Sequence, residues 1–95
     1  TIPSINSMII DLMKLKLNDG IKTVKLSEIY EYLEKRIEEP IFAGKFKLDT
    51  FRNTVRGELN HNELFADDAH SKKLYKREEK GVYSLTEFGK DFKGR

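Results

Sequence analysis

The sequence predicts an α+β domain that is mainly helical. Apolar side chains recur at helical spacing in three segments, at about residues 5–18, 28–38 and 50–60. Two short runs that each contain a leucine and a tyrosine, 73–77 and 82–85, follow near the C-terminal end and are separated by a glycine-containing turn. The chain has 95 residues, which is the size of one domain, so we expect residues 1–95 to fold as a single unit.

The first predicted helix spans about residues 5–18, with Ser4 as its N-cap and Asn18-Asp19-Gly20 at its end. Its apolar side chains surround most of the helix and leave only a polar stripe of Ser7, Asp11, Lys14 and Asn18. A surface helix normally has a narrower apolar face. This helix is therefore either central to the core or also covered by another surface through Ile10, Met13 and Leu17.

A short extended stretch at Val24-Lys25-Leu26 leads into the second helix, about 28–38, for which Ser27 is the predicted N-cap. The core face of this helix carries Ile29, Leu33 and Ile37, and its outer face is acidic. The helix ends at Glu39-Pro40, because the residue before proline is pushed out of the helical region. Residues 41–47 then form a loop with apolar anchors.

Asp49 is the predicted N-cap of the third helix, about 50–60. Its buried side carries Leu48, Phe51, Val55 and Leu59. The opposite side carries Asn53, Gly57 and Asn60, with Arg52 and Arg56 along one flank. Such a surface suits the DNA major groove, because Arg bonds guanine and Asn bonds adenine. A glycine inside a helix costs about 1 kcal/mol relative to Ala, and its missing side chain would allow close approach of a ligand.

The strands 73–77 and 82–85 are predicted to form a hairpin whose turn, Glu78 to Gly81, ends on a glycine with positive φ. Thr86 then caps a short final helix that docks through Phe88 and Phe92. The whole order of elements is that of a winged helix, with a three-helix core, a C-terminal β-hairpin wing and a short closing helix.

The net charge of +2 is small but unevenly distributed. Residues 1–40 contain six Lys and Arg against seven Asp and Glu, whereas residues 41–95 contain twelve against nine. A local excess of positive charge can attract a polyanion. The alternative interpretation is that these lysines form a solvated face without a partner. The candidate phosphate contacts lie just before the third helix and in the hairpin: Lys45, Lys47, Lys73, Lys76, Arg77 and Lys80.

Several classes of protein are not expected. The chain has no cysteine, which excludes disulfides, thiolate zinc sites and thiol nucleophiles and suits a reducing compartment. It has no apolar run near the roughly 20 residues that cross a bilayer, and no secretory signal, so we expect a cytoplasmic protein with no membrane partner. The first residue is Thr1 rather than Met, which suits a piece of a longer protein.

We also expect no enzymatic activity, cofactor or metal. His61 and His70 are nine residues apart, which is not a metal-ligand spacing. Glu78-Glu79-Lys80 matches the acidic-x-Lys tripeptide of some nucleases, with Asp67 or Asp68 as the upstream carboxylate. Those nucleases place their carboxylates around Mg²⁺ on a supported sheet, whereas this tripeptide is predicted at a hairpin turn.

Two stretches resemble known families. The segment Gly81 to Gly89 (GVYSLTEFG) resembles the exit from the wing in many winged-helix proteins. Residues 51–59 (FRNTVRGEL), taken with the hairpin, resemble helix-turn-helix modules of restriction endonucleases and of bacterial regulators, including the HARE-type group. The resemblance covers about residues 24–89 and implies double-stranded DNA binding through the third helix and the wing. It implies neither a target sequence nor a catalytic activity.

The wider fold also includes protein-interaction modules. The alternative function is therefore protein binding through the broad apolar surface of the first helix, with a parent catalytic domain or a second copy of the chain as the partner.

Overall fold

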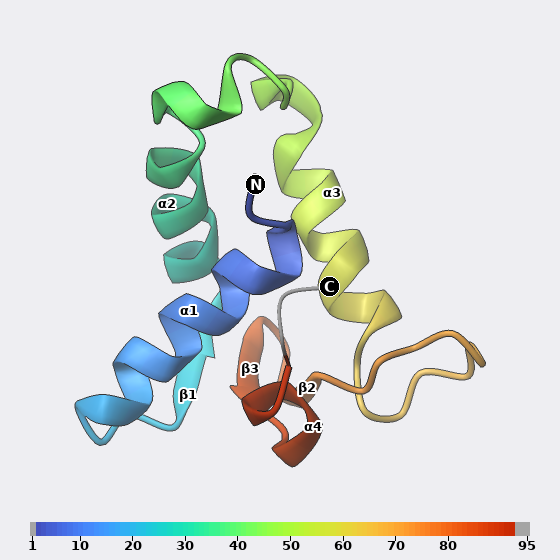
Figure 1. Cartoon of the computed structure of the whole chain (residues 1–95). Coiled ribbons are helices and arrows are strands. Elements are labelled where there is room, and N and C mark those ends of the chain that lie inside the picture. The colour runs from blue at the N-terminus through green and yellow to red at the C-terminus, as the bar shows by residue number, and fades with distance from the viewer. Residues whose placement is uncertain (1, 93–95) are drawn as a thin grey trace.

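The computed structural model describes residues 2–92 and has an α+β fold, which confirms the predicted class (Figure 1). The described elements are α1 (Ile5–Asn18), β1 (Thr23–Lys25), α2 (Leu26–Arg36), a 3₁₀ turn η1 (Pro40–Phe42), α3 (Leu48–His61), β2 (Tyr75–Glu79), β3 (Val82–Leu85) and α4 (Glu87–Lys90). The strands form an antiparallel sheet in the order β1-β3-β2. The segment predicted as extended at 24–26 is thus a third strand, one residue earlier than expected.

Helix α1 is central to the core, as its wide apolar surface allowed. Ser4 is its N-cap, because the Ser4 hydroxyl accepts a hydrogen bond from the backbone N–H of Ser7 at 3.1 Å. Ile10 and Met13 are each only 2% exposed, so these two side chains belong to the core and are not accessible to a partner. Leu15, by contrast, is exposed, so a partner surface on α1 remains a prediction that would rest on Leu15 and the half-buried Leu17.

Helix α2 starts two residues before its predicted first residue, and Ser27 is not its N-cap. The cap position is Lys25, where β1 runs directly into the helix. The backbone N–H of Leu26 donates to the carbonyl of Gly81 at 2.8 Å, and the Glu28 carboxylate accepts from the backbone N–H of Lys25 at 3.2 Å. The hairpin turn thus supplies an acceptor for one of the N–H groups that have no partner within the first turn of α2.

Helix α3 also begins earlier than predicted, with Lys47 at the cap position and Asp49 in its first turn. Leu48, expected on the buried side, is 66% exposed, because this first turn extends beyond the core. Phe46 occupies the place against the helix instead, with its ring centroid 5.3 Å from that of Phe51 and 5.9 Å from that of the buried Phe42. Phe42 and Phe46 are the apolar anchors expected in the 41–47 connection.

The hairpin lies two residues later in β2 than predicted. Lys73 has a positive φ of 55° and precedes the strand, whereas Glu78 and Glu79 lie within it. A register shift between Arg77 and Glu79 leaves a β-bulge in β2. Gly81 has a φ of 74°, as expected for the turn.

Helix α4 is capped as predicted, since the Thr86 hydroxyl accepts a hydrogen bond from the backbone N–H of Gly89 at 3.0 Å. Phe88 does not dock this helix, because its side chain is 64% exposed. The close contact between α4 and the rest of the protein is at Gly89 instead, because a Cβ added there would collide with the carbonyl oxygen of Leu74. Phe92 packs against the core as expected.

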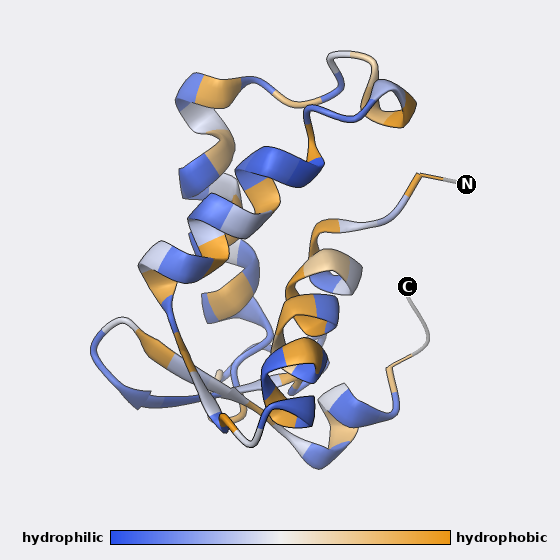
Figure 2. Ribbon diagram, turned by 90° about the vertical axis from the view of Figure 1, so that its left-hand side faces the viewer, coloured by the Kyte–Doolittle hydropathy of each residue, from blue (hydrophilic) through white to orange (hydrophobic). Residues whose placement is uncertain are grey.

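Figure 2 shows how these elements set the surfaces of the molecule. The hairpin turn, which follows the blue arrow of β2, extends to the lower left of that view, and the first turns of α3 lie at the upper left. Helix α4 lies on the opposite, right-hand side. The two elements predicted to contact DNA therefore face the same side. None of the helices described here combines the length and the apolar content needed to cross a lipid bilayer.

Candidate nucleic-acid interface

Helix α3 separates a buried face from a broad polar face. Phe51, Val55 and Leu59 are at most 1% exposed and pack into the core. At 100° per residue, the side opposite to them carries Asn53, Gly57 and Asn60, and Arg56 lies on its flank. All four are exposed, as the sequence predicted. Apart from the helix backbone and chain neighbours, no described atom lies within 4 Å of the point that a Gly57 Cβ would occupy.

Arg52 is on the flank of α3 that faces α2, and its guanidinium is engaged there. Its Nε and Nη2 atoms donate to the two carboxylate oxygens of Glu34, each at 2.9 Å. The guanidinium also lies over the ring of Tyr30, 4.9 Å from its centroid. The hydrogen bond from Arg52 lowers the pKa of Glu34, and the same bond raises the pKa of Arg52. In this structure Arg52 joins α2 and α3 through its pair with Glu34.

Asn53 and Arg56 contact each other on the outer face, where Arg56 Nη2 donates to Asn53 Oδ1 at 3.1 Å. The nearest carboxylate along the chain, Glu58, accepts from Asn6 and Asn62 on the other side of the helix. Among the described residues, no ion pair neutralises the Arg56 guanidinium. The outer face of α3 therefore keeps a positive charge.

The basic residues before α3 are also accessible. Lys45 and Lys47 are exposed, and Lys47 stands at the N-cap position of the helix. The Lys45 ammonium lies 5.6 Å from the ring centroid of Phe46, whose position is fixed by its contacts with other rings. Both lysines are thus placed at the N-terminal end of the helix that carries Asn53 and Arg56.

The basic residues of the hairpin point in different directions. Arg77 pairs with Tyr83 in the sheet and shares the side of the buried Tyr75, because strand residues alternate between the two sides. Lys76 pairs with Ser84 on the other side, and its ammonium lies 3.9 Å from the Glu78 carboxylate. Arg77 is exposed despite its inward direction, since β2 is the edge strand.

Lys80 is exposed in the turn itself. The structure also places Lys25 at this turn, because Lys25 pairs with Val82 across β1 and β3. Sequence reasoning missed Lys25, since only the long-range strand pairing brings it there. It also treated Asp49 as a cap, whereas Asp49 is an exposed carboxylate one turn before Asn53 on the outer face. Asp49 sets a local negative charge at the start of the candidate interface.

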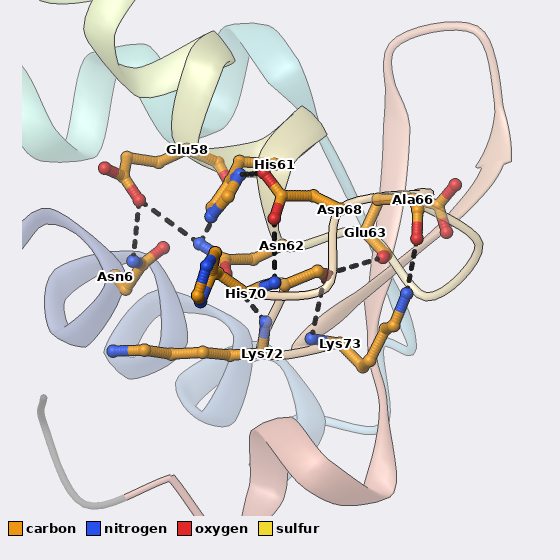
Figure 3. Close-up of polar contacts among 11 residues, drawn as sticks. Asn6, Glu58, His61, Asn62, Glu63, Ala66, Asp68, His70, Lys72 and Lys73 are labelled. Atoms are coloured by element: carbon orange, nitrogen blue, oxygen red, sulfur yellow. Dashed lines mark hydrogen bonds and ion pairs between the residues drawn. The ribbon is translucent and has the colours of Figure 1, made fainter.

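Lys73 belongs to a different environment, the connection between α3 and β2 (Figure 3). Its ammonium donates to the backbone carbonyl of Ala66, and its backbone N–H donates to the hydroxyl of Ser71 at 3.3 Å. These bonds close the connection onto itself. Lys73 therefore lies apart from the other predicted phosphate contacts, which lie in the hairpin and before α3.

Asn62 is the centre of this connection and is only 2% exposed. Its side-chain N–H groups donate to the backbone carbonyl and the carboxylate of Glu58, each at 3.2 Å, and its Oδ1 accepts from the backbone N–H of Lys72 at 3.0 Å. Its own carbonyl accepts from the backbone N–H groups of Leu74 and Tyr75. Asn62 thus joins the end of α3 to the start of β2 through both its side chain and its backbone carbonyl.

The same network continues into the core. Tyr75, which is fully buried, donates its hydroxyl to Asn6 Oδ1 at 2.7 Å, and the Asn6 amide donates to the Glu58 carboxylate at 2.9 Å. Burial, with a smaller contribution from the charge of Glu58, raises the pKa of Tyr75 well above its ordinary value. No buried side-chain nitrogen or oxygen in the described part of the chain lacks a hydrogen bond. This network therefore has a structural role.

The groups weighed for metal or catalytic chemistry are dispersed or engaged. His61 Nδ1 lies 3.2 Å from the Asp68 carboxylate, whose pKa is lowered first by a hydrogen bond from the backbone N–H of His70. Glu78 accepts from the Ser84 hydroxyl at 2.6 Å on β2. Within residues 2–92, no three His, Asp or Glu side chains form a group that could hold a metal ion.

Comparison of the chain with protein-family models, with curated proteins and with solved structures found no match. The function is therefore inferred from the residues of this chain and from their positions in the structure.

Proposed function

We propose that this chain is a winged-helix module that binds double-stranded DNA, with α3 in the major groove and the hairpin turn against the phosphate backbone. The observation that carries this proposal is the outer face of α3, which is uncovered and bears Arg56 and two asparagines. The order of the elements and the sheet order β1-β3-β2 are compatible with a winged helix. Such a module would serve a restriction enzyme or a transcriptional regulator as its recognition domain.

The proposal divides the basic and polar residues into three groups. Base contacts are assigned to the outer face of α3: Asn53, Arg56, Gly57 and Asn60. Phosphate contacts are assigned to exposed cations around it: Lys45, Lys47, Lys76, Arg77 and Lys80. Arg52 and Lys73 are assigned a structural role, because Arg52 donates two hydrogen bonds to Glu34 in α2 and the Lys73 ammonium donates to the backbone carbonyl of Ala66. Phosphate contacts fix the position of a protein on DNA, and base contacts select the sequence.

A salt titration of binding to a duplex of random sequence tests this proposal. If roughly three to five cations each neutralise one phosphate, the logarithm of the affinity should fall against the logarithm of the salt concentration with a slope of about −2.7 to −4.5. Arg77→Ala should reduce that slope by about one unit. Lys14→Ala, an exposed lysine on α1, is the matched control and should leave the slope unchanged. Binding that is absent at about 50 mM salt, or that does not depend on salt, contradicts the proposal.

A further inference from the structure

The hydrogen bond between Arg56 and Asn53 fixes which groups this part of α3 presents to a ligand. A guanidinium has five N–H donors and no acceptor, so the Asn53 atom that contacts it must be the carbonyl oxygen. One of the two lone pairs of the Asn53 carbonyl oxygen is thus used within the protein. Its amide N–H groups have no partner among the described residues, and neither do the remaining N–H groups of Arg56. The pair therefore presents donors to its surroundings.

The two purines differ in their demand for such donors. In the major groove, guanine presents two acceptors, O6 and N7, whereas adenine presents the N7 acceptor beside the N6 donor. An asparagine that reads adenine must accept from N6 with its carbonyl oxygen, and the Arg56 guanidinium competes for that oxygen. A pair that presents mainly donors matches guanine better than adenine.

We propose that Asn53 and Arg56 act as one guanine-reading unit, in which Asn53 positions the guanidinium of Arg56. This inference rests on the proposed DNA binding and makes it more specific. It also replaces the expectation, drawn from the sequence, that an asparagine on this helix reads adenine. Arg56 is the base-contacting residue of the unit, and Asn53 is its positioning residue.

The surroundings of the pair leave Arg56 available for this task. Gly57, the next residue, adds no side chain beside the guanidinium and leaves the helix surface open. Arg52, one turn earlier, is held by Glu34 and so does not compete for the same base. The Glu58 carboxylate, which would otherwise neutralise the charge, is bonded to Asn6 and Asn62.

Fluorescence anisotropy with three duplexes of equal length at one salt concentration tests the proposal. The duplexes are rich in G·C, rich in A·T, and rich in G·C with 7-deazaguanine in place of guanine, which removes the N7 acceptor. The wild-type chain should bind the first about tenfold more tightly than the second, as one bidentate Arg–guanine pair implies. The 7-deazaguanine duplex should lose most of that preference.

Variants separate the two roles. Arg56→Ala should abolish the preference for guanine. Asn53→Ala should reduce it to about threefold, because a less ordered guanidinium forms the bidentate contact less often. Thr54→Ala is the control, since Thr54 is exposed on the same helix and is not assigned a DNA contact. It should leave the loss on 7-deazaguanine substitution unchanged.

Each contrary result overturns a defined part of the account. Salt-dependent binding with equal affinity for all three duplexes overturns the guanine-reading unit and leaves DNA binding in place. A preference for G·C that 7-deazaguanine does not reduce also overturns it, because the DNA shape would then be the feature recognised. A preference for A·T that disappears in Asn53→Ala would show that Asn53 reads adenine. Absence of binding to every duplex overturns the proposed function itself.

Discussion

The outer face of α3 and the connection that follows it use the same residue types in opposite ways. On the outer face, the side chains of Asn53 and Arg56 bond to each other and to no other residue that the structure describes, and both residues are exposed. In the connection, Asn62 is buried, and its side chain bonds to both Glu58 and the backbone of Lys72 (Figure 3). A polar side chain whose bonding capacity is filled within the protein maintains the fold. One whose capacity remains available can recognise a ligand.

The largest expected difference comes from the same substitution in the two regions. Asn62→Ala should lower the free energy of unfolding by about 2–4 kcal/mol, because it removes three side-chain hydrogen bonds of a buried residue, two to Glu58 and one to the backbone N–H of Lys72. Asn53→Ala should change it by less than about 0.5 kcal/mol, as exposed substitutions usually do. Urea unfolding of both variants measures this comparison. Equal losses of stability would show that the two regions do not differ as described.

A second test removes one hydroxyl from the buried network. Tyr75→Phe should cost about 1–3 kcal/mol of stability at pH 7, because Asn6 Oδ1 loses its donor.

The same variant gives a pH dependence of known sign. Burial raises the pKa of Tyr75 in the folded chain above its ordinary value of 10.0, so the unfolded phenol ionises first. The contribution of Tyr75 is fully present below pH 10 and should decline as the pH rises from there toward the folded pKa. The stability advantage of the wild type over Tyr75→Phe should therefore shrink above pH 10. An advantage that grows with pH would contradict the burial of this hydroxyl.

The two arginines of α3 provide a matched pair for binding. Arg56→Ala should weaken binding to its preferred duplex by about 1–3 kcal/mol with little change in stability. Arg52→Ala should slightly lower stability, since it removes the pair with Glu34, and should leave the preference among duplex sequences intact. Anisotropy and thermal melting on both variants make the comparison. Sequence preference lost through Arg52 rather than Arg56 would place the base-reading surface on the other flank of the helix.

The smallest effect expected concerns glycine. Gly57→Ala should stabilise the chain by up to about 1 kcal/mol, because the position is open and alanine favours a helix. It should also weaken DNA binding if the helix backbone approaches the groove here. Gly89→Ala is the contrasting variant and should destabilise the chain, since its Cβ would collide with Leu74 and Leu85. Unchanged DNA binding in a stabilised Gly57→Ala would show that the backbone at Gly57 does not approach DNA.

Local patterns in the sequence predicted most of the elements. The spacing of Phe51, Val55 and Leu59 identified both the helix and its buried face, because a helical period depends only on neighbours along the chain. Ser4 and Thr86 were identified as caps because their partners lie three residues away. These signals are short in range, and so they can be read from the sequence.

The errors arise where the partner is distant in sequence. The start of α2 depends on a hydrogen bond from Leu26 to Gly81. These residues are far apart in the sequence, so the prediction of Ser27 as the N-cap did not include this bond. The engagement of Arg52 depends on Glu34 in another helix, so sequence alone grouped Arg52 with Arg56. Phe88 was predicted to dock α4, yet the close approach of Leu74 is to Gly89. Each correction shows which polar or apolar groups already have a contact within the protein. That information determines which residues belong to the candidate site.

Mapping of backbone amide shifts by NMR during titration with duplex DNA tests the central claim most directly. The account predicts that the largest changes occur at Asn53, Arg56, Gly57 and Asn60, with further changes around the turn at residues 77–81. The buried connection at Asn62 should change little, because its groups are bonded within the protein. Changes that are largest on α1 or α4, with none on the outer face of α3, would contradict the claim that α3 is the DNA-reading helix.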